Sequence, residues 1–189
     1  KHETYVSHSS SKKGFINGVY NLVRNRTLKG KRSLIKSLVP KGRIIDYGCG
    51  TGHFLKCLKD AEYDVLGFEP DNDARTFTKE NFNIETKPLE EFSELESGTI
   101  DVITMWHVLE HVYHLKRDFG QLVDKIKYGG YLVIAVPNRN SADAKKYGQY
   151  WAAYDVPRHL YHFTPSTMEN LMKRHGLHVV AKKPMWFDS

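Results

Sequence analysis

From Arg43 onward, short apolar runs alternate with stretches in which apolar residues recur every three or four positions. Short apolar runs bounded by turn residues are typical of buried strands, whereas the longer spacing indicates amphipathic helices. Strands and helices that alternate in this way favour parallel βαβ units. We therefore expect an α/β fold in which helices cover both faces of a mostly parallel sheet.

The pattern predicts six strands, the last of which follows the last helix. The predicted strands cover residues 43–47, 63–68, 83–86, 99–105, 131–136 and 177–187. The predicted helices cover 52–61, 71–81, a stretch that ends at Tyr128-Gly129-Gly130, and 165–175. Residues 131–136 are all apolar, which predicts a central strand buried on both faces.

Two stretches lie outside this alternation. Residues 1–41 show two amphipathic patterns that are separated near Thr27 and Gly30, so we expect a helical arm made of two helices. Residues 138–164 have no clear period but contain six aromatic residues. Disordered segments are poor in aromatic residues, so we expect an ordered lid inserted into a domain of residues 42–189.

Charge separates the arm from the rest of the chain. The 189 residues carry a net charge of +6, and between Thr4 and Ile45 there are ten basic residues and no acidic one. The arm therefore either contacts phosphates, anionic lipid or nucleic acid, or is a solvated helix face. No apolar run is long enough to span a bilayer, and the two cysteines form no disulfide framework, so a cytoplasmic protein is expected. The chain begins at Lys1, and we expect the native N-terminus to lie outside it.

A glycine turn joins the first predicted strand to the first helix of the domain. Its sequence is DYGCGTG, with Asp46, Gly48, Gly50 and Gly52 at every second position. A phosphate loop requires Lys after its last glycine, and a dinucleotide fingerprint requires its third glycine at position 53. Position 53 is His, so both alternatives fail. The turn suits the close approach of a nucleoside with an amino-acid tail. Glu69, which closes the next strand, suits bidentate hydrogen bonding to ribose hydroxyls.

Four motifs in order, DYGCGTGHF, GFEPD, DVITMWHVLEHV and GGYLVIAVPN, resemble the class I S-adenosylmethionine-dependent methyltransferases. The resemblance covers residues 43–138 and implies a Rossmann-like doubly wound sheet, S-adenosylmethionine as cofactor and S-adenosylhomocysteine as product. LEHV is similar to the branch of ubiquinone-biosynthesis O-methyltransferases, and YDVPRHLYHFTP to bacterial methyltransferases whose substrates are undefined. The family's sheet has a seventh, antiparallel strand, which we expect this chain to lack.

The resemblance also implies a set of cofactor contacts. Asp46 and the glycine loop would hold the methionine end, Glu69 the ribose, Pro70 and Leu89 the adenine, and Trp106 with His107 the reactive end. The KPLEEF stretch around Leu89 departs from the family's commoner Asp-Ala form. The full set is Asp46, Gly48, Cys49, Gly50, Thr51, Gly52, Glu69, Pro70, Leu89, Trp106 and His107.

His107, Glu110 and His111 form the pattern H-x-x-E-H. A zinc protease is rejected because the pattern directly follows a strand in a glycine-loop nucleotide fold. The resemblance implies a divalent metal held by Glu110 and His111, with His107 in place of an acid; imidazole ligands would favour zinc-like ions over Mg²⁺. In the alternative interpretation, Glu110 and His111 only cap and orient the start of a helix.

Methyl transfer to an alcohol or phenol requires removal of a proton, and histidine is the usual base near neutral pH. The candidates are His107 and, in the lid, His159 and His162. Arg158 could bind an anionic group of the acceptor, or could pair with Asp155 to fold the lid.

We expect methyl transfer to a small-molecule or lipid-linked acceptor, at oxygen. The basic arm is a candidate for peripheral membrane contact. One alternative is an RNA or protein methyltransferase that docks through the arm, but MWHV stands where an amine-methylating N-P-P-Y motif would be, so nucleic acid is not expected. The other alternative is a relative that binds the cofactor without catalysis.

Overall fold

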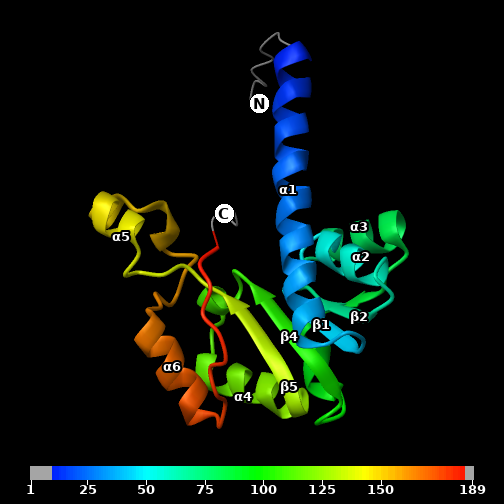
Figure 1. The fold of residues 1–189 in the computed structure, drawn as a ribbon, viewed down its shortest axis with the longest axis vertical. Helices are drawn as coiled ribbons and strands as arrows, with labels where there is room; N and C mark the ends of the chain where they lie inside the picture. The colour runs from blue at the N-terminus through cyan, green and yellow to red at the C-terminus, as the bar shows by residue number, and fades with distance from the viewer. Residues whose placement is uncertain (1–9, 186–189) are drawn as a thin grey trace.

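The computed structural model describes the backbone of residues 10–185 and side chains from residue 22 onward. Five parallel strands form one sheet in the order β3-β2-β1-β4-β5 (Figure 1). The strands are β1 Arg43–Tyr47, β2 Asp64–Phe68, β3 Thr86–Lys87, β4 Ile100–Trp106 and β5 Ile126–Ala135. The main helices are α1 Ser10–Leu38, α2 His53–Lys59, α3 Asn72–Phe82, α4 Leu115–Lys125, α5 Ala142–Tyr147 and α6 Pro165–Arg174. The predicted fold class is confirmed.

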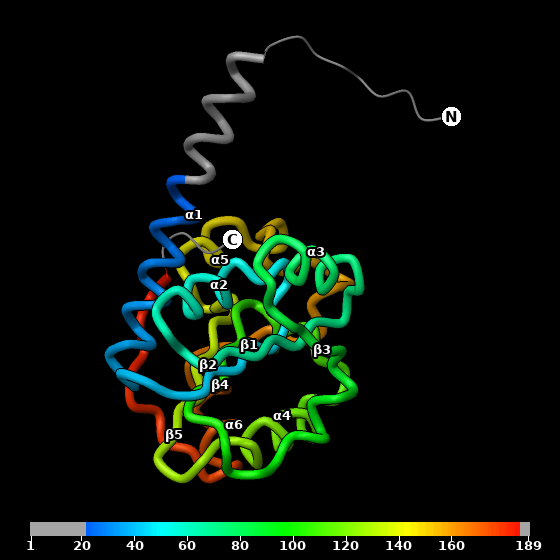
Figure 2. Tube along the Cα trace, turned by 90° about the vertical axis from the view of Figure 1, so that its right-hand side faces the viewer, coloured from blue at the N-terminus to red at the C-terminus, as the bar shows by residue number. Residues whose placement is uncertain are grey.

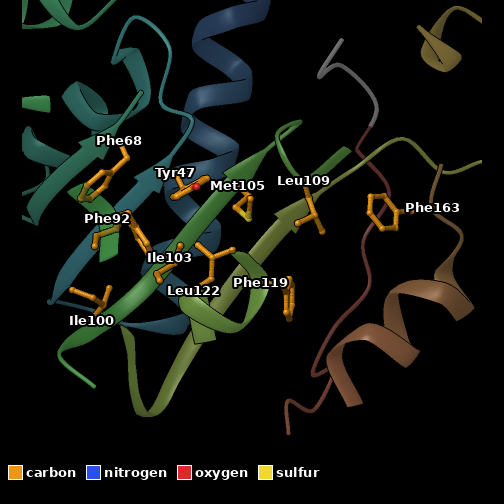
Figure 3. Packing of buried hydrophobic residues seen from close by; sticks show 11 residues of the cluster. Tyr47, Phe68, Phe92, Ile100, Ile103, Met105, Leu109, Phe119, Leu122 and Phe163 are labelled. Carbon is orange, nitrogen blue, oxygen red and sulfur yellow. The ribbon is translucent and has the colours of Figure 1, made fainter. Parts of the chain in front are cut away.

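Helices cover both faces of the sheet (Figure 2). On one face, Ile35 of α1 and Phe54 and Leu58 of α2 pack against Ile44 and Val102 of the central strands. On the other face, α4 and α6 pack over a larger cluster (Figure 3). That cluster holds Ile45, Tyr47, Phe68, Phe92, Ile100, Ile103, Met105, Leu109, Phe119, Leu122 and Phe163. It joins the sheet to the residues just before α6, so the C-terminal part of the fold is fixed to the same core as β1 and β4.

The arm is one helix, not two. α1 runs through Thr27 and Gly30 without a break. A glycine inside a helix costs only about 1 kcal/mol relative to alanine, and Ile35, which is fully buried, anchors the helix to the domain. Leu22 remains 71% exposed and Val23 40% exposed, so the apolar face that suggested a separate helix is not covered there.

The region between α4 and β5 also differs from the prediction. The helix ends at Lys125, and residues 126–130, including Tyr128-Gly129-Gly130, belong to β5. The pairing of β5 with β4 shifts register between Ile100 and Val102, and Gly129 adopts a positive φ of 80° at this irregularity. The prediction that residues 131–136 form a central strand is wrong, because β5 is the edge strand of the sheet that the structure describes and is only partly buried.

No strand is assigned to residues 177–185, so the sixth predicted strand is wrong for these residues, while 186 and 187 lie outside the described part of the chain. α6 forms as predicted, with a capping box between Thr164 and Thr167. Residues 138–164 hold α5 and two short 3-10 turns, and their ends meet at a bridge between Asn138 and Phe163. Among the described helices, none has both the length and the apolar character to cross a bilayer.

Candidate active site

The glycine loop leaves the carboxyl end of β1 and turns back onto β2. The backbone N–H groups of Gly48 and Cys49 both donate to the carbonyl of Phe68, at 2.7 and 3.1 Å. Gly48, Gly50 and Gly52 have φ values of 76°, 53° and 69°, a left-handed conformation that disfavours any residue with a Cβ. The loop therefore requires glycine at alternate positions for its backbone shape alone.

Close packing adds a second reason at two of these glycines. A Cβ on Gly48 would lie 2.4 Å from Cγ2 of Val108, and one on Gly52 would lie 2.4 Å from Cγ2 of Thr78. A Cβ on Gly50 would meet nothing within 4 Å. Gly48 and Gly52 thus face the protein, whereas Gly50 faces open space, where a ligand can approach the backbone.

Glu69, at the end of β2, uses both carboxylate oxygens on nearby backbone. Oε2 accepts from the N–H of Gly50 at 2.8 Å, and Oε1 accepts from the N–H of Asp71, the N-cap residue of α3, at 3.1 Å. Glu69 is 9% exposed. Each oxygen keeps further acceptor capacity for a hydroxyl group. Glu69 therefore organises the glycine loop in addition to the ribose contact that the sequence resemblance implies.

Replacing Glu69 with Gln should weaken S-adenosylmethionine binding by roughly 10–100-fold, because the amide keeps one acceptor oxygen and loses charge-assisted hydrogen bonds worth about 1.5–3 kcal/mol. Isothermal titration calorimetry measures the change. Glu80→Gln, on an exposed part of α3, is the matched control and should bind as the wild type does. Equal affinity of Glu69→Gln and the wild type would contradict the assigned role.

Asp46 is buried beneath the loop, with 2% exposure. Its Oδ1 accepts a hydrogen bond from the hydroxyl of Thr104, which is its neighbour in the β1–β4 register, at 2.6 Å. Burial raises the pKa of Asp46 to about 7, and the hydrogen bond from Thr104 and the charge of Lys31 oppose this shift. Thr104 was missed in the sequence; a polar residue within the apolar run IDVITMW was the signal for it.

The other predicted contacts around the loop differ in exposure. Burial raises the pKa of the Cys49 thiol, which keeps it protonated and unreactive. Thr51 and Pro70 are exposed and accessible to a ligand. Leu89 is partly buried and packs against the large core cluster at the start of a 3-10 turn, Leu89–Glu94. Their contacts with the cofactor stay predictions.

Trp106 ends β4 and meets residues from two helices. Its ring packs edge-on against Phe54 of α2, with centroids 5.5 Å apart, and Nζ of Lys31 lies 4.3 Å from the ring centroid. A cation over an indole face is a favourable contact. The basic arm thus contributes Lys31 to the carboxyl end of β4, which no sequence motif indicated.

His107 follows Trp106 and turns the chain away from the sheet. Its φ is 57°, and its N–H donates to the carbonyl of Ala135 at 3.0 Å. Its Nδ1 lies 3.4 Å from Oε1 of Glu110, which is completely buried. Because the next residue, Val108, packs directly on Gly48, the His107–Glu110 pair lies beside the glycine loop.

A second histidine group forms on the other side of Glu110. Glu110, His111 and His159 each offer a ligand atom within 4.8 Å of the others, so the predicted pair Glu110 and His111 gains its third member from the lid. The donor types fit a zinc-like ion. His162 lies apart: its Nε2 contacts the carbonyl of Tyr154 at 3.1 Å, and its ring packs edge-on against Tyr154.

Arg158 pairs with Asp155 inside the lid. Its Nη2 and Nε lie 2.6 and 3.1 Å from Oδ1 of Asp155, and its side chain is 76% exposed. This pair agrees with the interpretation in which the two residues fold the segment.

Comparisons with known proteins support the cofactor that this geometry suits. The model of the family described as "Methyltransferase domain" matches residues 22–182. The ubiquinone biosynthesis O-methyltransferase of Acinetobacter baylyi is 29% identical over 106 residues, which cover 52% of this chain and 44% of that protein. A methyltransferase of Anoxybacillus flavithermus is 26% identical over 164 residues, covering 79% of this chain and 77% of that protein. The chain therefore spans less than half of the first relative.

Solved structures agree on the fold. A SAM dependent methyltransferase from Archaeoglobus fulgidus gives a TM-score of 0.61 at 23% identity, over 83% of this chain and 74% of that one. A SAM-dependent methyltransferase from Thermotoga maritima gives 0.64 at 22% identity, over 86% and 77%. Since the family model matches well over half of the sequence, the chain belongs to the methyltransferase domain family, and it shares its fold with these S-adenosylmethionine-dependent methyltransferases of known structure.

Proposed function

We propose that this methyltransferase transfers the methyl group to an oxygen atom of a small-molecule or lipid-linked acceptor. The observation that carries the proposal is the pair of His107 and Glu110 beside the glycine loop, with Nδ1 and Oε1 3.4 Å apart. The charge of a buried carboxylate next to an imidazole stabilises the protonated form of the ring. That is what a base needs when it takes a proton from a hydroxyl group.

The proposed reaction requires one bond exchange and one proton transfer. Bound S-adenosylmethionine would supply the methyl group: the acceptor oxygen would bond to the methyl carbon as the carbon–sulfur bond breaks, with its electron pair left on the sulfur of neutral S-adenosylhomocysteine. The imidazole of His107 takes the hydroxyl proton. The remaining task is to align the reactants and exclude water, to which Trp106, Lys31 and the segment 138–164 are suited by their position around the carboxyl end of β4.

The nature of the acceptor is supported by one relative and by the arm. The Acinetobacter baylyi relative is named an O-methyltransferase of ubiquinone biosynthesis. In the arm, the exposed Leu22 and Val23 lie among basic residues of α1, a combination that suits the surface of an anionic membrane. A lipid-linked acceptor presented at such a surface would be within reach of the domain.

The test compares matched acceptors. A phenol, an alcohol and an aniline, each with and without a long alkyl tail, are incubated with the enzyme and S-adenosylmethionine. We expect release of S-adenosylhomocysteine and an oxygen-methylated product by mass spectrometry, with faster turnover of the tailed compounds. Methylation of the aniline alone would overturn the proposal. Cofactor binding without turnover of the whole panel would instead favour a non-catalytic relative.

A further inference from the structure

We propose that Glu110, His111 and His159 bind a zinc-like transition-metal ion that fastens the segment 138–164 to the turn after β4. Glu110 and His111 lie on the 3-10 turn Leu109–His111, whereas His159 is 48 residues later in the chain than His111. One ligand atom of each residue lies within 4.8 Å of the other two. The site would therefore join two parts of the fold, and it does not depend on which acceptor the enzyme methylates.

The two histidines are held in the tautomer that a metal requires. Nδ1 of His111 lies 3.0 Å from the carbonyl of Arg158, and Nδ1 of His159 lies 2.8 Å from the carbonyl of Ala153. A carbonyl can only accept, so in each ring Nδ1 carries a hydrogen, and when the ring is neutral Nε2 keeps the lone pair. Metal-bound histidines usually make this hydrogen bond with the ring nitrogen that does not bind the ion.

Glu110 supplies the negative charge. It is fully buried, and neither of its carboxylate oxygens has a hydrogen-bond partner among the described residues. Its neighbour His107 faces Oε1 at 3.4 Å. A buried carboxylate without hydrogen bonds is unfavourable, and a divalent cation is the partner that would compensate for it.

The backbone around the cluster is already joined. The N–H groups of Leu160 and Tyr161 donate to the carbonyl of Glu110, at 2.8 and 3.3 Å. Tetrahedral zinc with bonds of about 2.0–2.1 Å places its ligand atoms roughly 3.4 Å apart. Shifts of about an ångström in the side-chain positions would therefore bring the three ligand atoms to that spacing. His111 is exposed and gives the ion a route from solvent. Asp155 Oδ2 lies 3.8 Å from Nε2 of His159, but its carboxylate is held by Arg158.

This ligand set differs from the one that the H-x-x-E-H pattern suggests. In the pattern, His107 would be the third ligand. In the structure, His159 joins Glu110 and His111, and Nδ1 of His107 lies 3.4 Å from Oε1 of Glu110. Two imidazoles and one carboxylate leave a fourth position open, as in catalytic zinc sites. An ion bound there would supply Lewis acidity at the edge of the lid.

The test is zinc binding by the chain after removal of metals with a chelator. Calorimetric titration with Zn²⁺ should show one ion per chain, and Co²⁺ should give the visible absorption of a four-coordinate site. His159→Asn and Glu110→Gln should each lower zinc affinity by at least roughly 10–100-fold, the range seen even for outer partners of metal ligands. His162→Asn, in the same segment, is the matched control. Zinc should also slow proteolysis within 138–164 in the wild type but not in His159→Asn.

Three outcomes would overturn the proposal: no zinc binding by the wild type, unchanged affinity in His159→Asn, or loss of affinity in His107→Asn but not in His159→Asn. The second would place the ion outside the cluster of Glu110, His111 and His159. The third would restore the ligand set of the sequence pattern. If Glu110→Gln does not fold, the comparison of His159→Asn with His162→Asn still decides.

Discussion

The ligand-free wild type should lose stability as the pH rises from about 4 to about 7, and Asp46→Asn should abolish this loss. Burial raises the pKa of Asp46 from 3.8 to about 7, so the folded state binds the proton more tightly than the unfolded state. The stabilisation is therefore complete below pH 3.8 and is lost as the pH rises through 7. At about 1.36 kcal/mol per pKa unit, it amounts to at most about 4 kcal/mol. Urea unfolding at several pH values measures it.

The quantity to compare is the difference in unfolding free energy between wild type and variant, because Asp101 and Asp124 have lowered pKa values and contribute the opposite slope to both proteins. As the pH rises, the unfolding free energy of Asp46→Asn should increase relative to that of the wild type. Asp73→Asn, at an exposed position on α3, is the matched control and should not reproduce this change with pH. A constant difference for Asp46→Asn too would mean that Asp46 is already ionised in the folded protein.

The same carboxyl group links stability to cofactor binding. S-adenosylmethionine carries positive charge on its sulfonium and amino groups, and the sequence resemblance places its methionine end at Asp46. A cation there favours the ionised carboxylate. Calorimetry at about pH 6.5, just below the raised pKa, in buffers of different ionisation enthalpy should therefore show proton release on binding. Asp46→Asn should not show it.

Gly48→Ala should destabilise the fold by about 2–5 kcal/mol. The left-handed backbone costs an alanine roughly 1–2 kcal/mol, and the new Cβ would lie 2.4 Å from Val108, which adds the usual overpacking cost of about 1–3 kcal/mol. Chemical denaturation of the ligand-free protein measures the loss. S-adenosylmethionine affinity should fall as well, because Val108 must shift and His107 precedes it.

Two further variants separate the causes. Gly50→Ala has the same backbone strain, with φ of 53°, but nothing within 4 Å of its Cβ, so it should lose only about 1–2 kcal/mol. In Gly48→Ala combined with Val108→Ala, the steric part should be recovered and the backbone part should remain. If Gly48→Ala and Gly50→Ala were equally stable, the contact with Val108 would not be tight.

The fold was largely predictable because each local signal agreed with the next. β1 matches its predicted bounds, and α3 and α6 begin directly after the capping residues Asp71 and Thr164. The predictions were wrong where a local sequence pattern is compatible with two structures. The Gly129-Gly130 pair, typical of a helix end, lies instead in an irregular part of β5. The apolar stretch after Gly176 has no strand paired with it among the described residues, and a strand requires a partner.

The site was predictable where residues follow directly from strand ends. The glycine loop and Glu69 lie at the carboxyl ends of β1 and β2, as their spacing indicated. The hydrogen bond from Gly50 to Glu69 and the approach of Lys31 to Trp106 depend on how loops and α1 close in space. His159 comes close to Glu110 because of the path of segment 138–164. This segment has no regular hydrophobic pattern, so its path could not be predicted from local sequence.

The bridge between Asn138 and Phe163 has a consequence for how this enzyme can evolve. Arg139 N–H also donates to the Phe163 carbonyl at 2.8 Å, so the two ends of the segment lie side by side. Closing a longer or shorter loop at such a point changes the entropy cost only slowly. The part of the segment between Asn138 and the cluster of Glu110, His111 and His159 can therefore change in length and sequence while the glycine loop between β1 and α2 stays unchanged.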